Sequence, residues 1–199
     1  MIVIYTIELQ GGCKIMNAIE LMVEEHKLIK RMLTVVRKFS IKVLNHEEVD
    51  YNDFYKVIDF VRNYADKHHH SKEELILFKR MGEILGERIA NGPIMGMLTE
   101  HDLGRLFIGN LEAAVQKFQA GDNDSRVDII ANAIAYTDLL NRHIDKEDTA
   151  IYTFAQRSLT KEQLEEIDLQ CKNVENEATN NSLQDKYVKL LSELESKIG

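Results

Sequence analysis

The sequence of 199 residues contains no tryptophan, a single proline and only two cysteines. Because helix breakers are so scarce, the composition favours long helices. The two cysteines, Cys13 and Cys171, are far apart and lack the spacing of a metal-binding motif. A disulfide framework is therefore not expected, and a reducing cytoplasm is the expected compartment. The first residues also lack a basic leader, so no signal peptide is expected.

Long apolar runs and concentrated positive charge are missing as well. No apolar stretch approaches the roughly 20 residues that a membrane-spanning helix needs, so no such helix is expected. The formal net charge is -8 and the basic residues are scattered along the chain. This distribution argues against nucleic acid or an anionic membrane surface as the main partner.

Four long stretches carry apolar residues at three- and four-residue steps, which is the period of an amphipathic helix. They cover approximately residues 18–44, 50–85, 94–119 and 125–157. Because the joints between them are short, an antiparallel up-and-down order is the simplest topology. The predicted fold is therefore all-α: an antiparallel up-down four-helix bundle with extra C-terminal helices.

The predicted bundle, residues 16–157, is flanked by two extensions. Residues 1–15 have strand-like composition and include Gly11-Gly12 shortly before Met16. One hypothesis is that Met16 is the natural start and that residues 1–15 are not native. Residues 158–199 form a C-terminal helical extension without histidine, which is expected either to cover the bundle or to form the surface of a homodimer.

One short pattern occurs twice, late in the second and fourth predicted helices. It reads His-x-x-Lys-Glu-acid-x-x-aliphatic-aromatic and occupies residues 69–78 and 143–152. Residues four apart are stacked neighbours on a helix, so each copy aims one imidazole and one carboxylate in the same direction. Imidazole and carboxylate groups together suit iron or manganese and require no thiolate.

Each predicted long helix carries a histidine within its apolar pattern, and the two repeats add one glutamate each. Taken singly, such a histidine is more often a hydrogen-bonded core residue, and a His-x-x-x-Glu pair is more often an exposed helix pair. Taken together, four imidazoles and two carboxylates inside a bundle would be very costly without a cation. The predicted metal site consists of His26, His69, Glu73, His101, His143 and Glu147.

The second predicted helix contains three consecutive histidines, so the ligand has to be chosen by register. Successive residues of an α-helix are about 100° apart, which allows only one of His68, His69 and His70 to face the bundle axis. His69 and Glu73 lie near the apolar arc and match the second repeat. The choice leaves open a rival pair, His70 and Glu74.

With these motifs the sequence resembles the hemerythrin-like, or HHE cation-binding, family over about residues 16–157. The motifs are Glu24-Glu25-His26-Lys27, His69-x-x-Lys-Glu73, Glu100-His101-Asp102-x-Gly104-Arg105 and His143-x-x-Lys-Glu147. In that family these positions hold a non-haem di-iron centre. The resemblance implies two iron ions, with zinc or manganese less favoured. It also implies that the two irons are bridged by Glu73 and Glu147. The terminal ligands that it implies are the four imidazoles of His26, His69, His101 and His143.

One position departs from the oxygen-carrying hemerythrins, which place a second histidine four residues after the histidine of the third helix. This chain has Arg105 there, and arginine cannot deprotonate to act as a ligand. The remaining ligand set resembles that of the iron-centre repair proteins of the same superfamily. Two six-coordinate irons joined by an oxo or hydroxo bridge would then keep about two positions free for a small molecule.

The function that the resemblance implies is binding of, or reaction with, dioxygen, nitric oxide or peroxide, in sensing, detoxification or iron-centre maintenance. The alternatives are a non-enzymatic metal-binding or signalling module and an iron storage or supply protein. Near the site, Tyr136 is expected to be either a core residue or a hydrogen-bond donor to a bound oxygen species. Arg105 is expected to neutralise acidic residues such as Glu100, and Lys72 and Lys146 are expected to stay in solvent.

Overall fold

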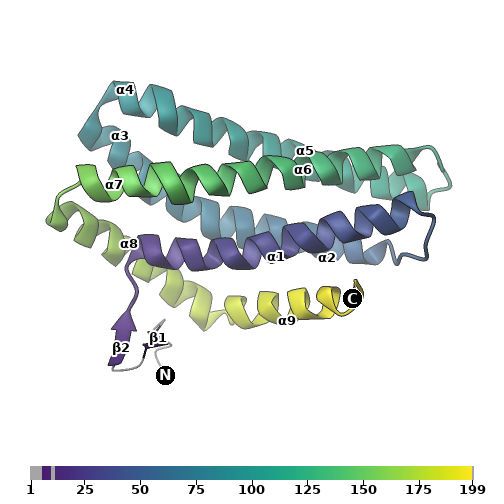
Figure 1. Ribbon diagram of the computed structural model, residues 1–199, viewed down its shortest axis with the longest axis horizontal. Coiled ribbons are helices and arrows are strands. Elements are labelled where there is room, and N and C mark those ends of the chain that lie inside the picture. The colour runs from purple at the N-terminus through teal and green to yellow at the C-terminus, as the bar shows by residue number, and fades with distance from the viewer. Residues whose placement is uncertain (1–5, 10–11, 199) are drawn as a thin grey trace.

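The computed structural model describes residues 6–9 and 12–198, and four long antiparallel helical rods form its body (Figure 1). The first rod is α1 (Ala18–Leu44). The third rod is α5 (Met95–Gln119), which follows two short helical segments, α4 (Glu87–Ile89) and η3 (Ala90–Ile94).

The second and fourth rods change their winding along their length. The second rod consists of α2 (Asn52–Phe60), the π-helices η1 (Val61–His70) and η2 (Glu73–Phe78), and α3 (Lys79–Leu85). The fourth consists of α6 (Ser125–Lys146), the π-helix η4 (Glu147–Ile151) and α7 (Tyr152–Ser158). The π-helical turns therefore recur at the same place in both copies of the repeated pattern. Single π turns within helices are frequent at functional sites.

Two further helices and a small hairpin complete the described part of the chain. Helices α8 (Lys161–Asn180) and α9 (Leu183–Glu195) run along one side of the bundle, against α1 and the second rod (Figure 1). Strands β1 (Thr6–Leu9) and β2 (Gly12–Ile15) pair antiparallel ahead of α1. The predicted all-α four-helix bundle with extra C-terminal helices is confirmed.

Side-chain caps fix where two of these helices begin. Asn17 accepts a hydrogen bond from the backbone N–H of Glu20, whose carboxylate accepts in return from the backbone of Asn17, and α1 starts there. Thr160 and Gln163 make the same reciprocal pair at the start of α8. The carboxylate of Asp168 on α8 also accepts from the backbone N–H of Ala18 at 2.7 Å, which ties the extension to the start of the bundle.

The apolar core is divided into two clusters with a polar layer between them. The larger cluster fills the half of the bundle near the α1–α2 connection and includes Phe39, Phe54 and Leu111. The smaller cluster fills the other half and includes Met22 and Phe78. The predicted site residues lie between the two clusters along each rod. The apolar packing on both sides therefore holds the polar layer out of water.

The C-terminal extension is part of the core of the bundle. Tyr187, Leu191 and Leu194 of α9 are buried in the larger cluster together with residues of α1 and α2. Of the two predicted roles of the extension, covering the bundle is the one that the structure shows. Within the described residues, the helices are too short or too polar to cross a membrane.

If α9 belongs to the core, truncating Leu191 must leave a cavity. We expect Leu191→Ala to lower the free energy of unfolding by about 2–5 kcal/mol, because its side chain is fully buried. The matched control, Val188→Ala on the exposed side of α9, should change it by less than about 1 kcal/mol. Urea unfolding followed by circular dichroism measures both values. A near-neutral Leu191→Ala would show that the extension is dispensable for the core.

Candidate metal centre

The six side chains predicted as metal ligands meet at one place between the four rods. All six are at most 1% exposed, so the site is closed off from bulk solvent. Each rod supplies one histidine, and the second and fourth rods add a glutamate at the start of a π turn. The contributions are His26 from α1, His69 and Glu73 from η1 and η2, His101 from α5, His143 from α6 and Glu147 from η4.

The site has two similar halves, each built on a pair of imidazoles. The rings of His26 and His69 are 4.5 Å apart between centroids and inclined by 63°. The rings of His101 and His143 are 4.6 Å apart and inclined by 65°. The two repeats thus generate an approximate internal symmetry that relates one pair of rods to the other.

The carboxylates of Glu73 and Glu147 lie between the two halves. Glu73 places Oε1 3.6 Å from Nε2 of His69 and Oε2 3.5 Å from Nε2 of His101. Glu147 places Oε2 3.4 Å from Nε2 of His26 and Oε1 2.9 Å from Nε2 of the α6 histidine. Each carboxylate therefore presents one oxygen to each half, which is the arrangement that a carboxylate bridging two cations requires.

Many of the inward-facing atoms have no hydrogen-bond partner among the described residues, because the close approaches lack hydrogen-bond alignment. They are Nε2 of His26 and His69, Oε2 of Glu73 and both carboxylate oxygens of Glu147. In the other half, Nε2 of His101 and Nε2 of His143 are 2.9 Å apart. Two nitrogens that bind one metal ion at right angles through bonds of roughly 2.1 Å are about 3 Å apart. Buried polar atoms are costly when unsatisfied, so this donor set fits metal cations.

The outer nitrogen, Nδ1, of each predicted ligand histidine donates to a carboxylate on a neighbouring rod. Because a carboxylate only accepts, Nδ1 carries the hydrogen and Nε2 keeps its lone pair toward the centre. Each rod orients the histidine of the next rod, and the fourth returns to the first. The pairs are His69 with Glu25 at 2.7 Å, His101 with Glu74 at 2.6 Å, His143 with Glu100 at 2.8 Å and His26 with Asp148 at 2.7 Å.

The orienting role of these four carboxylates was not predicted from the sequence. A signal was available, because each of them is the direct neighbour of a predicted ligand. Glu25 and Glu100 precede the histidines of the first and third rods, and Glu74 and Asp148 follow the glutamates of the second and fourth. The sequence alone does not show that each of them accepts a hydrogen bond from a histidine on another rod.

Burial and neighbouring charges shift the pKa values of the imidazoles in opposite directions. Burial and the nearby His26 lower the pKa of His69 to about 3. Burial also opposes charge on His26, but the two carboxylates of η4 outweigh it and raise the pKa of His26 to about 9. Burial also opposes charge on His101, but the nearby carboxylate of Glu147 and the hydrogen bond to Glu74 outweigh it and raise the pKa of His101 to about 10.

The pKa values of the two central carboxylates are also shifted in opposite directions. Burial and the charge of Glu147 raise the pKa of Glu73 well above its usual value. Burial acts in the same direction on Glu147, but the close approach of His101 and His143 outweighs it and holds the pKa of Glu147 well below its usual value. Without metal ions, protons on His26, His101 and Glu73 compensate the buried charge.

All three consecutive histidines of η1 are buried, and both His69 and His70 lie among the central donors, so the expectation that only one of the three faces the bundle axis is wrong. That expectation assumed α-helical winding, whereas η1 is π-helical. A π-helix bonds residue i to residue i+5 and has more residues per turn, so successive side chains diverge by less than 100°. His69 faces Glu73, and His70 stacks on His101 with ring centroids 3.8 Å apart. His70 and Glu74, the rival pair, do not face the centre together, because Glu74 lies outside it and accepts a hydrogen bond from Nδ1 of His101.

Lys72 is completely buried, so the expectation that it stays in solvent is wrong. Its ammonium group donates to Glu25 and to Glu175 of α8. His68 joins this cluster, with Nε2 3.0 Å from Glu25 and 3.2 Å from Glu175. Burial opposes the charge on Glu25, but Lys72 and the hydrogen bonds from His68 and His69 together outweigh it and hold the pKa of Glu25 well below its usual value. Lys146, the equivalent in the second repeat, is exposed as expected and pairs with Glu100.

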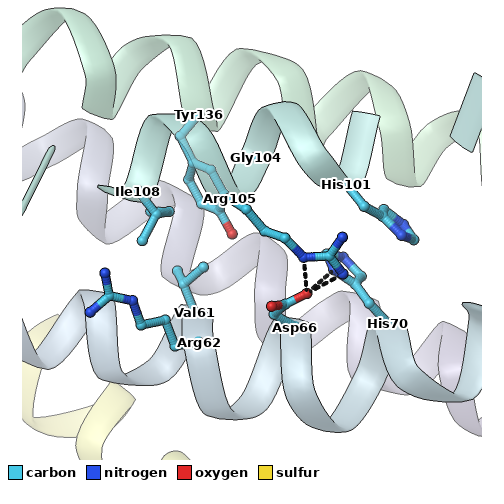
Figure 2. A pocket seen from close by; sticks show the side chains of 9 residues that line it. All are labelled: Val61, Arg62, Asp66, His70, His101, Gly104, Arg105, Ile108 and Tyr136. Carbon is cyan, nitrogen blue, oxygen red and sulfur yellow. Dashed lines mark hydrogen bonds and ion pairs between the residues drawn. The ribbon is translucent and has the colours of Figure 1, made fainter. Parts of the chain in front are cut away.

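A cavity of about 110 Å³ lies beside the His101 half of the site (Figure 2). Arg105 extends along it and binds Asp66 at 2.7 Å and Glu74 at 2.6 Å. Arg105 therefore neutralises acidic residues near the site, but Glu100 is not one of the acidic groups it contacts in the described structure. Glu100 pairs with Lys146 and His143 instead.

Two tyrosines lie near the site, Tyr136 in the cavity with His101 and Tyr152 against His26 and Glu73. Tyr136 lines the cavity, and its buried hydroxyl has no hydrogen-bond partner within the described part of the chain (Figure 2). Burial raises the pKa of Tyr136. Tyr152, which the sequence analysis did not single out, donates its hydroxyl hydrogen to Glu73 and stacks on His26 with centroids 5.6 Å apart. The sequence feature that could have indicated Tyr152 is its place as the aromatic residue at the end of the second repeat.

The fold and the buried donor set together define a metal-binding domain of the four-helix-bundle class. The family model of the hemerythrin HHE cation binding domain matches residues 17–155. The chain therefore belongs to the hemerythrin HHE cation-binding family, as the resemblance predicted. The searches of the curated proteins and of the solved structures gave no match.

The buried Lys72 yields a stability prediction with an internal control. We expect Lys72→Met to lower the free energy of unfolding of the metal-free protein by about 3–5 kcal/mol, because it removes the ammonium group that pairs with the buried carboxylates of Glu25 and Glu175. Lys146→Met, the same change at the equivalent exposed position, should cost at most about 1 kcal/mol. Urea unfolding measures both. Equal effects of the two substitutions would refute the buried cluster.

Metal uptake should release protons, because His26 and His101 have raised pKa values of about 9 and about 10 and bind a cation only when neutral. Between pH 6 and pH 8 both are protonated in the metal-free protein. The apparent affinity should therefore rise with pH, by about tenfold per pH unit for each proton released. Titration of the metal-free protein with Co²⁺ against a competing chelator measures this slope. An affinity that does not change over this range would contradict the pKa values.

Proposed function

We propose that this chain holds a pair of non-haem iron ions at the centre of the bundle and binds or reacts with dioxygen, nitric oxide or peroxide there. The observation that supports the proposal most strongly is the placement of Glu73 and Glu147, each with one oxygen toward either imidazole pair. Two carboxylates in this position suit two cations side by side. His26 and His69 would hold one ion, and the other two histidines the second.

The chemistry of the donors favours iron over zinc. The six groups are imidazoles and carboxylates without a thiolate, which suits iron or manganese. A structural zinc ion prefers four ligands in a tetrahedron, whereas two shared carboxylates and four imidazoles offer more donors than two such sites need. When bound, the iron pair would supply the electrons for reaction with an oxidising small molecule. We propose the cytoplasm as the compartment, because the chain has only two cysteines.

The cavity beside His101 limits which molecules reach the site. Its volume of about 110 Å³ accommodates molecules of a few atoms and excludes large organic substrates. Tyr136 supplies a hydroxyl hydrogen in an otherwise largely apolar wall, and the raised pKa keeps that hydroxyl protonated. It would donate a hydrogen bond to a small oxygen-containing ligand. Arg105 adds a fixed positive charge that favours an anionic or strongly polar ligand.

Iron content tests the proposal directly. We expect protein reconstituted anaerobically with Fe²⁺ to bind two irons per chain and to develop near-ultraviolet oxo-bridge absorption in air. Glu147→Ala should lose the paired site, since it removes a carboxylate that faces both halves. The matched control is Asp138→Ala, an exposed carboxylate on the same rod, which should keep two irons. A single zinc ion that iron cannot replace would refute the di-iron proposal.

Rapid mixing of the reduced protein with each small molecule then separates the possible roles. Tight, reversible association with dioxygen or nitric oxide without turnover would support sensing. Catalytic consumption of peroxide would support detoxification. Release of iron to a chelating acceptor, with no response to any of the three molecules, would favour the alternative of iron storage or supply.

A further inference from the structure

His70 is a buried imidazole that the six-residue donor set leaves out. It lies on η1 directly after His69 and lines the cavity beside His101 (Figure 2). One nitrogen of His70 is close enough to ligand atoms of Glu73, His101 and His143 that all four atoms lie within 4.8 Å of one another. Its position is therefore that of a further metal ligand in this half of the site.

The hydrogen bonding of His70 follows the pattern of the four predicted ligands. Nδ1 of His70 donates to Asp66 at 3.2 Å, one helical turn earlier on η1. As with the other four imidazoles, a carboxylate takes the Nδ1 hydrogen and leaves the Nε2 lone pair available for a cation. His68, two residues away, is different, because its Nε2 faces the carboxylates of Glu25 and Glu175.

Arg105 holds the orienting groups of this half together. It donates to Asp66, which orients His70, and to Glu74, which orients His101. The two imidazoles are stacked with centroids 3.8 Å apart and an interplanar angle of 9°. One guanidinium therefore fixes, through two carboxylates, a pair of adjacent rings at the wall of the cavity.

From this geometry we propose that Nε2 of His70 is a fifth imidazole ligand, binding the metal ion that His101 and His143 hold. This inference rests on the proposed di-metal function. It makes the two halves unequal: one ion has two imidazoles, and the ion next to the cavity has three. His70 then adds to the pair His69 and Glu73 and does not replace it.

The test uses Co²⁺ alone as the probe on the full-length metal-free protein. We expect His70→Ala to bind one of two Co²⁺ ions at least about tenfold more weakly and to change the visible spectrum of that ion only. Lys67→Ala, the control at an exposed position of the same π-helix, should bind both ions as the unaltered protein does. Free imidazole added to His70→Ala should restore the original spectrum, which a merely structural role would not produce.

A second variant guards against loss of the fold. His70→Gln keeps a polar side chain of similar reach but has no imidazole, and it should show the same weakened ion without rescue, because the glutamine fills the space that imidazole needs. Unchanged affinity and spectrum in either folded variant, or failure of imidazole to restore the spectrum of His70→Ala, would overturn the proposal. If the unaltered protein binds fewer than two Co²⁺ ions, the di-metal function fails as well, so the two failures are distinguishable.

Discussion

The structure depends on the meeting of two buried carboxylates with the Nε2 atoms of four imidazoles, in a layer from which water is excluded. Glu73 and Glu147 face one another across the bundle with unsatisfied oxygens, and in the second half the nitrogens of His101 and His143 are 2.9 Å apart. Such a collection of acceptors is unfavourable unless protons or cations occupy the space between them. The raised pKa values of His26, His101 and Glu73 show that protons stabilise this layer in the metal-free protein. Two bound metal ions would supply the positive charge in place of these protons.

The rest of the molecule holds this layer in place. Two apolar clusters pack on either side of it, and the C-terminal helices close the flank through Leu191 and Glu175. Around the centre, a carboxylate of each rod orients the histidine of the next rod. Three of these four carboxylates are each paired with a positively charged side chain. Lys72 binds Glu25, Arg105 binds Glu74, and Lys146 binds Glu100. The central histidines are thus fixed by successive layers of charge-assisted hydrogen bonds, which limit their motion.

Much of this arrangement could be predicted from the sequence, because it depends on period and repetition. The apolar period gave the four rods, and α1 was placed at residues 18–44 as observed. The repeated pattern selects four of the six side chains that the structure brings together, and the histidines within the apolar patterns of the first and third rods add His26 and His101. What could not be predicted depends on local winding and on contacts between rods. The π-helical turns of η1 turn His70 inward and were not visible in a pattern read at 100° per residue. The burial of Lys72 depends on α8 lying across it, which no local pattern encodes.

The central claim is that six side chains from four rods hold two metal ions side by side. Anomalous X-ray diffraction from crystals of the iron-loaded protein, measured at the iron absorption edge, tests it most directly. The account predicts two peaks, one next to His26 and His69 and one next to His101 and His143, with Glu73 and Glu147 in contact with both. A single peak, or iron bound only outside this layer, would contradict the account.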